Sequence, residues 1–424
     1  MILLLSSMTI LLLMDVPIAV AMGLSSLCYL LIQTDIPLMV VPQTMYNGTE
    51  SFILLAIPLF IFAGKLMDRG GLSQKIVNFA SSLVGFIKGG LAMVSVLAAM
   101  FFSGISGSAN ADTAAISSLT IPAMKKKNYH PGFAASLLSS AGSIGVILPP
   151  SIPMVVFAAL TNVSVSKMFL GGVIPGILCG VALMVFSYIV ARRENLPRES
   201  RFELKNVWIS FKEAIFALGM PFIILGGIFS GMFTATESAA IAVLYGFVLG
   251  TFVYRKIKIR DIMEIAKETA MMTAIPMFVV ATSATFVWVM SEQKATESLL
   301  SSLLMLTDNP YVVLMLMNIA LLILGTFLDA LPAIVLSAPF IVEIAAQYHI
   351  DPVFLGVITV FNMAIGFGTP PVGVTLFISC SVAEIKLPDT YKYLWWALGA
   401  MTVVLLLITY IPGLVMYLPN LIAK

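Results

Sequence analysis

The sequence predicts an all-α polytopic membrane protein that contains an inverted repeat. Three observations support this prediction: the hydrophobic composition, a repeat at a fixed offset of 221 residues, and the distribution of Lys and Arg along the chain. Of the 424 residues, 60% are hydrophobic and 10% are charged, whereas soluble chains carry about 25% charged residues. A chain of this length has room for roughly ten to twelve spans of ~20 residues each.

The repeat relates two apolar segments that are interrupted by Gly and Pro. Residues 130–150, HPGFAASLLSSAGSIGVILPP, align without a gap on residues 351–371, DPVFLGVITVFNMAIGFGTPP. In this alignment Gly145 falls on Gly366, and the two Pro-Pro pairs coincide. Corresponding broken segments in the two halves of a chain are typical of the binding site of a secondary transporter.

Ten apolar stretches are candidate membrane spans. They lie at about residues 2–14, 16–33, 50–67, 131–161 (broken), 169–190, 214–233, 237–253, 271–290, 351–382 (broken) and 393–417. Two further apolar pairs, 89–124 and 310–346, have a small or polar centre and arms of under 20 residues. We expect these pairs to be re-entrant helical hairpins, because non-helical backbone at membrane depth is tolerated where it is buried in protein or lines a cavity.

The distribution of basic residues predicts the topology. With the N-terminus on the periplasmic side, the cytoplasmic segments hold 20 of the 23 Lys and Arg residues, as the positive-inside rule requires. The first hairpin is followed by MKKKNYH, whereas the second is followed by AAQYHID, which has no Lys or Arg. The first hairpin should therefore open to the cytoplasm and the second to the opposite side, so that the repeat is inverted in the membrane.

This map divides the chain into four parts. They are the N-terminal scaffold spans (1–55), the first repeat (56–190, with hairpin 89–124 and broken helix 131–161), a cytoplasmic connector with scaffold spans (191–270), and the second repeat (271–424, with hairpin 310–346 and broken helix 351–382). Amphipathic stretches at 70–89 and 291–306 predict helices that lie at the membrane interface.

The hairpin tips and the helix breaks bring polar groups into apolar segments. Residues 103–114, SGISGSANADTA, form the first tip, and GTFLDALP at 325–332 forms the second. The prolines of each break leave nearby carbonyls without helical partners. Such carbonyls, beside hydroxyl groups, are hard oxygen ligands that suit a small cation such as sodium. The helix that starts after each break can face an anion with its N-terminus.

Each of these residues also has a purely structural interpretation. Gly and Ser in membrane helices often serve only close helix packing. Asp112 and Asp329 are intramembrane carboxylates, which are expensive and functional by default, but either side chain can instead cap the second arm of its hairpin. Asn110 either contacts substrate or ends the turn. Glu237, near the start of a span, is expected to be a helix cap.

The sequence offers little support for other classes of function. It contains no Ser-His-Asp order, HExxH motif, P-loop or nucleotide-binding fingerprint, so we expect no enzyme, no cofactor and no nucleic-acid partner. Cys28, Cys179 and Cys380 are isolated in apolar stretches and suggest buried side chains. Two rivals stay open: an intramembrane enzyme with Asp112 and Asp329 as a catalytic pair, and a passive channel.

These stretches also resemble a known family. The similarity lies in AIPLFIFAGKLMDRGGLSQKIV (56–77), GGLAMVSVLAAMFFSGISGSANADTAAISSLTIPAMKKKNYHPGFAAS (89–136), GSIGVILPPSIPMVVFA (142–158), FTATESAAIAVLYG (233–246) and GFGTPPVGVTLF (366–377). Together they resemble the large membrane subunit of the tripartite ATP-independent periplasmic (TRAP) transporters, within the ion transporter superfamily.

The resemblance implies a sodium-coupled importer of an organic acid that works by an elevator motion in the bacterial inner membrane. Its expected partners are a small membrane subunit, as a separate chain, and a periplasmic protein that delivers the acid, of the sialic acid or C4-dicarboxylate class. A sodium-coupled anion transporter of the same superfamily that needs no binding protein is the alternative. The resemblance implies Ser103, Ser106, Gly145 and Pro149 for one sodium ion and Gly325, Gly366 and Thr369 for another. From their place at the tips and breaks, we expect the substrate to be contacted by Asn110, Asp112, Asp329, Pro150 and Pro371.

Overall fold

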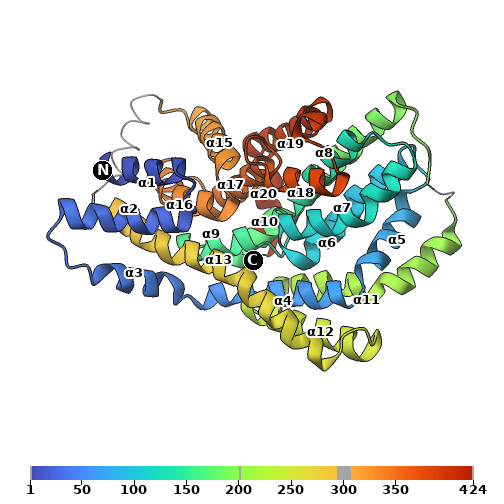
Figure 1. Cartoon of the computed structure of the whole chain (residues 1–424), viewed down its shortest axis with the longest axis horizontal. Helices are drawn as coiled ribbons and strands as arrows, with labels where there is room; N and C mark the ends of the chain where they lie inside the picture. The colour runs from blue at the N-terminus through green and yellow to red at the C-terminus, as the bar shows by residue number, and fades with distance from the viewer. Residues whose placement is uncertain (1, 200–201, 294–306, 423–424) are drawn as a thin grey trace.

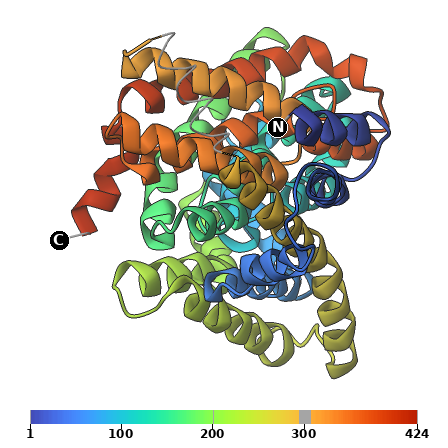
Figure 2. The same cartoon turned by 90° about the vertical axis from the view of Figure 1, so that its left-hand side faces the viewer.

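The computed structural model describes residues 2–199, 202–293 and 307–422, and these residues form helices joined by short turns, without strands. Figure 1 shows the elongated bundle, and Figure 2 shows it from one end. Both views place α11 (Leu204–Phe229) and α12 (Ala235–Val248) along one side, while α17 (Pro352–Phe367) and α19 (Tyr391–Tyr410) lie toward the other. The interfacial helix that we expect at 291–306 lies almost entirely outside the described residues.

The remaining helices are short in the N-terminal part and at the two breaks. They are α1 (Ile2–Leu13), α2 (Ile18–Gln33), α3 (Val40–Thr49), α4 (Ala56–Arg69), α5 (Ser73–Val84), α6 (Gly90–Ser106), α7 (Ala109–Lys126), α8 (Pro131–Gly142), α9 (Ile152–Thr161), α10 (Val165–Arg193), α13 (Ile259–Glu292), α15 (Pro310–Phe327), α16 (Ala330–Gln347), α18 (Val374–Ala383) and α20 (Gly413–Ile422), with single turns η1 (Phe52–Leu55), η2 (Ser143–Val146), η3 (Leu249–Val253) and η4 (Leu387–Thr390).

By length and composition, seven helices of the described part can cross a membrane, or eight if the bent pair formed by α3 with η1 and α4 counts as one span. The ten spans expected from the sequence are counted differently: they include two broken helices, each of which is divided into shorter helices in the structure, and they leave out α15 and α16, which are among the seven. The first two expected spans correspond to α1 and α2, of 12 and 16 residues. Twelve residues reach about 18 Å, which is short of the ~30 Å hydrocarbon core.

Two helix ends differ from the expected spans. The expected span 393–417 is wrong as a single helix: α19 ends at Tyr410, and Ile411 is non-helical (φ −123°, ψ 77°) because it precedes Pro412. The expected span 271–290 is only part of α13, which begins at Ile259 and has 34 residues. The expected boundaries at residues 190 and 270 fall inside α10 and α13, and the one at residue 55 falls between η1 and α4.

The internal repeat is present in the helices themselves. Helices α7 and α16 have 18 residues each and begin 221 positions apart, after the N-cap residues Ser108 and Asp329. Helices α8 and α17 also begin 221 positions apart, each with Pro at its first position. Both Pro-Pro pairs, in the breaks that follow, have a cis peptide bond. The two halves therefore repeat the same order of a helical pair and a broken helix.

The broken helices form the core of the bundle. In α8 every residue from Gly132 to Gly142 is buried, and in α17 every residue from Val353 to Phe367 is buried. Outside this core, the prediction for Glu237 is confirmed: its carboxylate accepts a hydrogen bond from the backbone N–H of Thr234 at 2.8 Å, in a capping box that starts α12.

A buried polar network ties α15 to α17 and α19. Asn362 Nδ2 donates to Asn318 Oδ1 at 2.8 Å and to the carbonyl of Ile358 at 2.9 Å. Asn318 Nδ2 in turn donates to Thr409 Oγ1 at 3.0 Å. All of these side chains are buried. The network joins the first arm of the second helical pair to the broken helix. Asn318 lies seven residues before Gly325, and Asn362 lies four residues before Gly366, where the two backbones meet.

Replacing Asn318 with Leu is expected to lower the free energy of unfolding by about 1 kcal/mol, since Asn362 then loses its side-chain partner in a buried site. Thermal unfolding of the detergent-purified chain measures this loss. The double variant Asn318→Leu/Asn362→Leu is expected to recover part of it, because no amide is then left buried and half-paired. Equal stability of the Asn318→Leu variant and the wild type would contradict the structural role of the network.

Candidate functional site

The turn of the first helical pair lies directly against the break between η2 and α9. Gly107 ends α6 with a positive φ of 63°, a conformation that glycine adopts without strain. Its carbonyl accepts a hydrogen bond from the Ile152 N–H at 3.3 Å. A Cβ at Gly107 would lie 2.7 Å from the carbonyl oxygen of Pro150. Only glycine allows the turn and the break to approach so closely.

Asp112 links the turn to the glycines of the break. Its Oδ1 accepts a hydrogen bond from Ser106 Oγ at 2.5 Å, and Ser106 Oγ accepts one from the Ser108 N–H at 3.1 Å. Asp112 is 1% exposed, and its Oδ2 has no hydrogen-bond partner among the described residues. The same Oδ2 occupies the space that a Cβ at Gly145 would need. The turn thus presents one unpaired carboxylate oxygen to the break.

The residues expected at the first sodium site are all at this junction. Helix α6 contacts η2, which contains Gly145, and Ser103, Gly145 and Pro149 are buried. The Ser103 hydroxyl donates inside α6, to the carbonyls of Ala99 and Met100 at 2.9 Å each, so its oxygen is left to act as an acceptor. No group of three or more His, Cys, Asp or Glu in the described part is arranged to hold a metal ion.

The second helical pair meets its break in a similar way. A Cβ at Gly366 would lie 2.5 Å from the carbonyl oxygen of Gly325, so the backbones of α15 and α17 are in contact. The Val372 N–H donates to the carbonyl of Thr326 at 3.3 Å. Thr369 Oγ1 donates to the carbonyl of Ile365 at 2.7 Å. The structure therefore brings Gly325, Gly366 and the segment around Thr369 together.

The two halves differ in exposure. Asp329 is exposed and caps α16, where its Oδ1 accepts a hydrogen bond from the Ala330 N–H at 2.9 Å. Pro371 is exposed as well, whereas Pro150 and Asp112 are buried. The capping interpretation therefore describes Asp329. It does not describe Asp112, which lies one turn further along its helix, because Ser108 is the N-cap residue of α7. The first junction is closed and the second is open.

One hydroxyl connects the two junctions. Thr375 Oγ1, in the first turn of α18, donates to the carbonyl of Phe367 across the second break at 2.8 Å. It also lies 3.0 Å from Ser139 Oγ and 3.4 Å from Ser143 Oγ, which belong to the first half. Sequence reasoning did not single out Thr375, although a threonine in the apolar stretch GVTLF was a visible signal.

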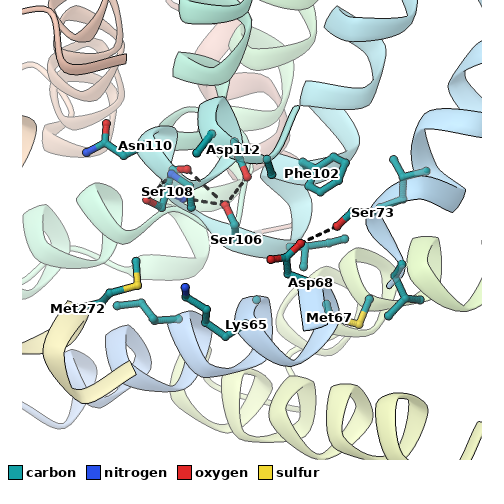
Figure 3. Close-up of a pocket in the computed structure, with 18 residues that line it drawn as sticks. Lys65, Met67, Asp68, Ser73, Phe102, Ser106, Ser108, Asn110, Asp112 and Met272 are labelled. Carbon is teal, nitrogen blue, oxygen red and sulfur yellow. Dashed lines mark hydrogen bonds between the residues drawn. The ribbon is translucent and has the colours of Figure 1, made fainter. Parts of the chain in front are cut away.

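A cavity of about 520 Å³ lies between the first turn and helices α4 and α5 (Figure 3). Three of the residues expected to act in transport, Ser106, Asn110 and Asp112, line it, whereas Pro150, Asp329 and Pro371 do not. Figure 3 shows Lys65 rising from α4 toward the turn. The sequence analysis did not single out Lys65, although a lysine inside the apolar segment AIPLFIFAGKLM was a visible signal.

Comparison with known proteins identifies the family of the chain. The family described as "Tripartite ATP-independent periplasmic transporter, DctM component" matches residues 5–414. The chain belongs to this family. The prediction from the sequence is thereby confirmed, and the chain is a multi-span helical membrane protein of the DctM family. Its curated relatives of this kind are named as transporter permeases.

Two relatives illustrate the range of the DctM family. The chain is 38% identical to the sialic acid TRAP transporter large permease protein SiaM of Vibrio cholerae, over 96% of this chain and 95% of that protein. It is 39% identical to the isethionate TRAP transporter permease protein DctMQ of Oleidesulfovibrio alaskensis, over 96% of this chain but only 64% of the relative's length. The chain thus spans slightly less than two thirds of the DctMQ protein.

A solved structure shares the fold. The crystal structure of the Alcanivorax borkumensis YdaH transporter, described as having an unusual topology, superposes with a TM-score of 0.61. The sequences are 14% identical, and the superposition covers 91% of this chain and 89% of the other. The likeness concerns the fold alone.

Proposed function

We propose that this chain is the large membrane subunit of a sodium-driven transporter that imports an organic acid anion across the bacterial inner membrane. The single observation that carries the proposal is the repeated junction of a helical turn with a helix break. In one half the Ile152 N–H bonds the Gly107 carbonyl, and in the other the Val372 N–H bonds the Thr326 carbonyl, at 3.3 Å each. Paired broken helices of this kind suit ion and substrate binding in secondary transporters.

The first junction has the chemistry of a sodium site. It offers hydroxyl oxygens from Ser103 and Ser106, the carbonyls freed around Pro149, and the unpaired Oδ2 of Asp112 beside Gly145. These are hard oxygen donors in a buried place, where an unpaired carboxylate oxygen is expensive. At the second junction, Gly325, Gly366 and Thr369 supply backbone and hydroxyl oxygens. We assign one sodium ion to each junction.

The same arrangement supports the proposed transport cycle. The pairs α6–α7 and α15–α16 act as re-entrant hairpins that open to opposite sides of the membrane, with the N-terminus in the periplasm. Each pair moves together with its broken helix as a transport domain, in an elevator motion past the surrounding helices. A small membrane subunit, as a separate chain, and a periplasmic protein that delivers the acid complete the system. The sialic acid and isethionate relatives suggest the range of acids.

Uptake into proteoliposomes tests the proposal. The chain is reconstituted with its small subunit, and a labelled acid is supplied by its binding protein, with and without an inward sodium gradient. Accumulation is expected only when both the gradient and the binding protein are present. Accumulation with sodium alone would favour a transporter of the same superfamily that works without a binding protein. Equilibration that needs no gradient would instead favour a channel.

Replacing Ser103 or Thr369 with Leu is expected to abolish sodium-dependent uptake, because a bulky apolar side chain fills the space beside the oxygen donors of its junction. Membrane insertion, measured as the yield of detergent-purified chain, should stay at the wild-type level. Ser118→Leu is the matched control, since Ser118 is exposed on α7 and bonds only the carbonyl of Ala115. Unaltered uptake by both site variants would reject the assignment.

A further inference from the structure

A second cavity, the α10–α19 groove, lies between these two helices and away from both junctions. Its volume is about 810 Å³, within the ~300–1,000 Å³ range of small-molecule sites. The residues that line it recur at helical spacing, from Ala182 to Glu194 on α10 and from Lys392 to Val403 on α19, so each helix contributes one face. None of its described lining residues belongs to either junction.

The charged residues of the groove are confined to one end. Arg193 is the last residue of α10, Glu194 is its C-cap, and Lys392 lies in the first turn of α19. The side chains that line the rest of the groove are apolar or aromatic. Arg193 and Lys392 are both exposed, and neither forms an ion pair with a carboxylate in the described part of the chain. Two cations are therefore available to a ligand at this end.

The carboxylate at the same end is engaged with a tyrosine. The Tyr393 hydroxyl donates a hydrogen bond to Glu194 Oε1, and Lys392 Nζ donates to the same hydroxyl at 3.3 Å. Glu194 therefore holds the buried tyrosine in place instead of pairing with Arg193. With two positive charges and one negative charge, the lining has a net charge of +1. A ligand with one negative charge neutralises it.

The groove is about as deep as one leaflet of a membrane. Arg193 follows Ala182 by eleven residues, and the lining of α19 is equally long, which corresponds to about 16 Å of helix, roughly half of the ~30 Å hydrocarbon core. Helix α20 packs against the other half of α10, where a Cβ at Gly171 would lie 3.4 Å from Val415 Cγ1. A spanning helix of a partner needs the full thickness, so the groove suits acyl chains better.

The walls of the groove are open to the surrounding membrane. Val185 on α10 is 53% exposed and Trp396 on α19 is 68% exposed. Trp396 lies one turn from Lys392, and tryptophan is enriched where membranes meet water. Lys and Arg gather on the cytoplasmic side of membrane proteins, so the charged end of the groove faces the cytoplasmic leaflet.

We propose that the α10–α19 groove binds one molecule of phosphatidylglycerol from the cytoplasmic leaflet, with its phosphate at Arg193 and Lys392 and its acyl chains along the two helices. Basic pockets between membrane helices on the cytoplasmic side bind anionic headgroups. Helix α10 follows the first broken helix and α19 follows the second, so the lipid joins the two halves of the repeat on their outer surface. This site does not depend on the proposed transport of an acid.

Lipid binding to the full chain tests the proposal. The detergent-purified, lipid-depleted chain is mixed with phosphatidylglycerol, phosphatidylethanolamine or cardiolipin with the same acyl chains, and native mass spectrometry counts the bound molecules. One phosphatidylglycerol is expected to bind about tenfold more tightly than phosphatidylethanolamine, which has no net charge. Cardiolipin, with two phosphates, should bind no more tightly. Glycerol 3-phosphate, which lacks acyl chains, should not displace the lipid.

Arg193→Gln and Lys392→Gln should each weaken the binding of phosphatidylglycerol about fivefold. Arg192→Gln is the matched control, because it removes the same charge from the neighbouring residue. Arg192 lies over the ring of Tyr188 and does not line the groove, so binding should change less than about twofold. Equal effects of Arg192→Gln and Arg193→Gln would mean that the lipid follows the general surface charge, and would overturn the site.

The acyl part of the groove is tested by Ala182→Trp, which fills its apolar end and leaves both cations in place. This variant should bind phosphatidylglycerol no better than phosphatidylethanolamine. Leu244→Trp is the matched control, since Leu244 is 63% exposed on α12 and lies outside the groove. Far-UV circular dichroism of the lipid-free variants checks the fold, and the exposed charge variants keep the test decisive if Ala182→Trp does not fold.

Four results would reject the proposal. They are equal binding of phosphatidylglycerol and phosphatidylethanolamine, tighter binding of cardiolipin, displacement of the lipid by glycerol 3-phosphate, and unchanged binding to Ala182→Trp. Loss of lipid binding on addition of the small membrane subunit would assign the groove to that subunit instead.

Discussion

Adding one methyl group at Gly366 or at Gly145 is expected to reduce sodium-driven uptake about a hundredfold. At Gly366 the new Cβ would lie 2.5 Å from the carbonyl oxygen of Gly325, so α15 and α17 must separate by about 1 Å to reach ordinary contact; misplacement on this scale costs on the order of 10² in rate. At Gly145 the Cβ would displace the carboxylate of Asp112. Initial rates of uptake in proteoliposomes measure both effects.

The chain supplies matched controls for these variants. A Cβ at Gly226 in α11 or at Gly399 in α19 would meet nothing within 4 Å. Gly226→Ala and Gly399→Ala should therefore keep the wild-type rate of uptake and gain up to about 1 kcal/mol of helix stability. If Gly366→Ala and Gly145→Ala transport as fast as these controls, the contacts between turns and breaks are not needed for transport.

A cysteine at position 372 is expected to react with a charged methanethiosulfonate reagent about a hundredfold faster than one at position 151. The two positions are equivalent in the repeat, but Val372 is 37% exposed and Ser151 is 0% exposed. The neighbouring Asp329 is exposed as well. Reaction at position 151 requires local opening, and the fraction of time spent open sets its rate.

The labelling experiment is best done on the purified chain, with mass spectrometry as the readout. Both variants are made in a background in which Cys28, Cys179 and Cys380 are replaced with Ala, and denaturation in detergent should make their rates equal. Equal rates in the folded chain would contradict the difference between a closed first junction and an open second one. A faster rate at position 151 would mean that the chain rests in the opposite state.

The sequence was sufficient to predict the repeated order of elements because glycine and proline restrict the backbone locally. The Pro-Pro pairs predict a break after α8 and after α17, and Ser108 and Asp329 mark where α7 and α16 begin. The expected spans were less accurate where helix length depends on packing rather than on hydropathy. Helix α13 continues through its charged N-terminal turns, because Glu268 forms ion pairs with Lys65 and Arg69 of α4.

The candidate site was only partly visible in the sequence. Ser106, Asn110 and Asp112 are close in sequence and stand out as polar groups in an apolar segment, so their grouping at one cavity follows from local pattern. Lys65 and Thr375 reach their sites from distant elements. No periodicity within one segment shows which residue another segment will face, and this explains why both were missed.

The shared hydroxyl of Thr375 has a consequence for the energetics of the two halves. Because it bonds the carbonyl of Phe367 and also contacts Ser139, a movement of either break changes a hydrogen bond of the other. In the proposed sodium-driven cycle, an ion bound at one break would therefore alter the affinity of the other break for its own ion, and thermodynamic reciprocity would make the two effects equal in size. Where that coupling is favourable, the two ions would bind and leave together, and transport cycles that carry only one of them would be suppressed.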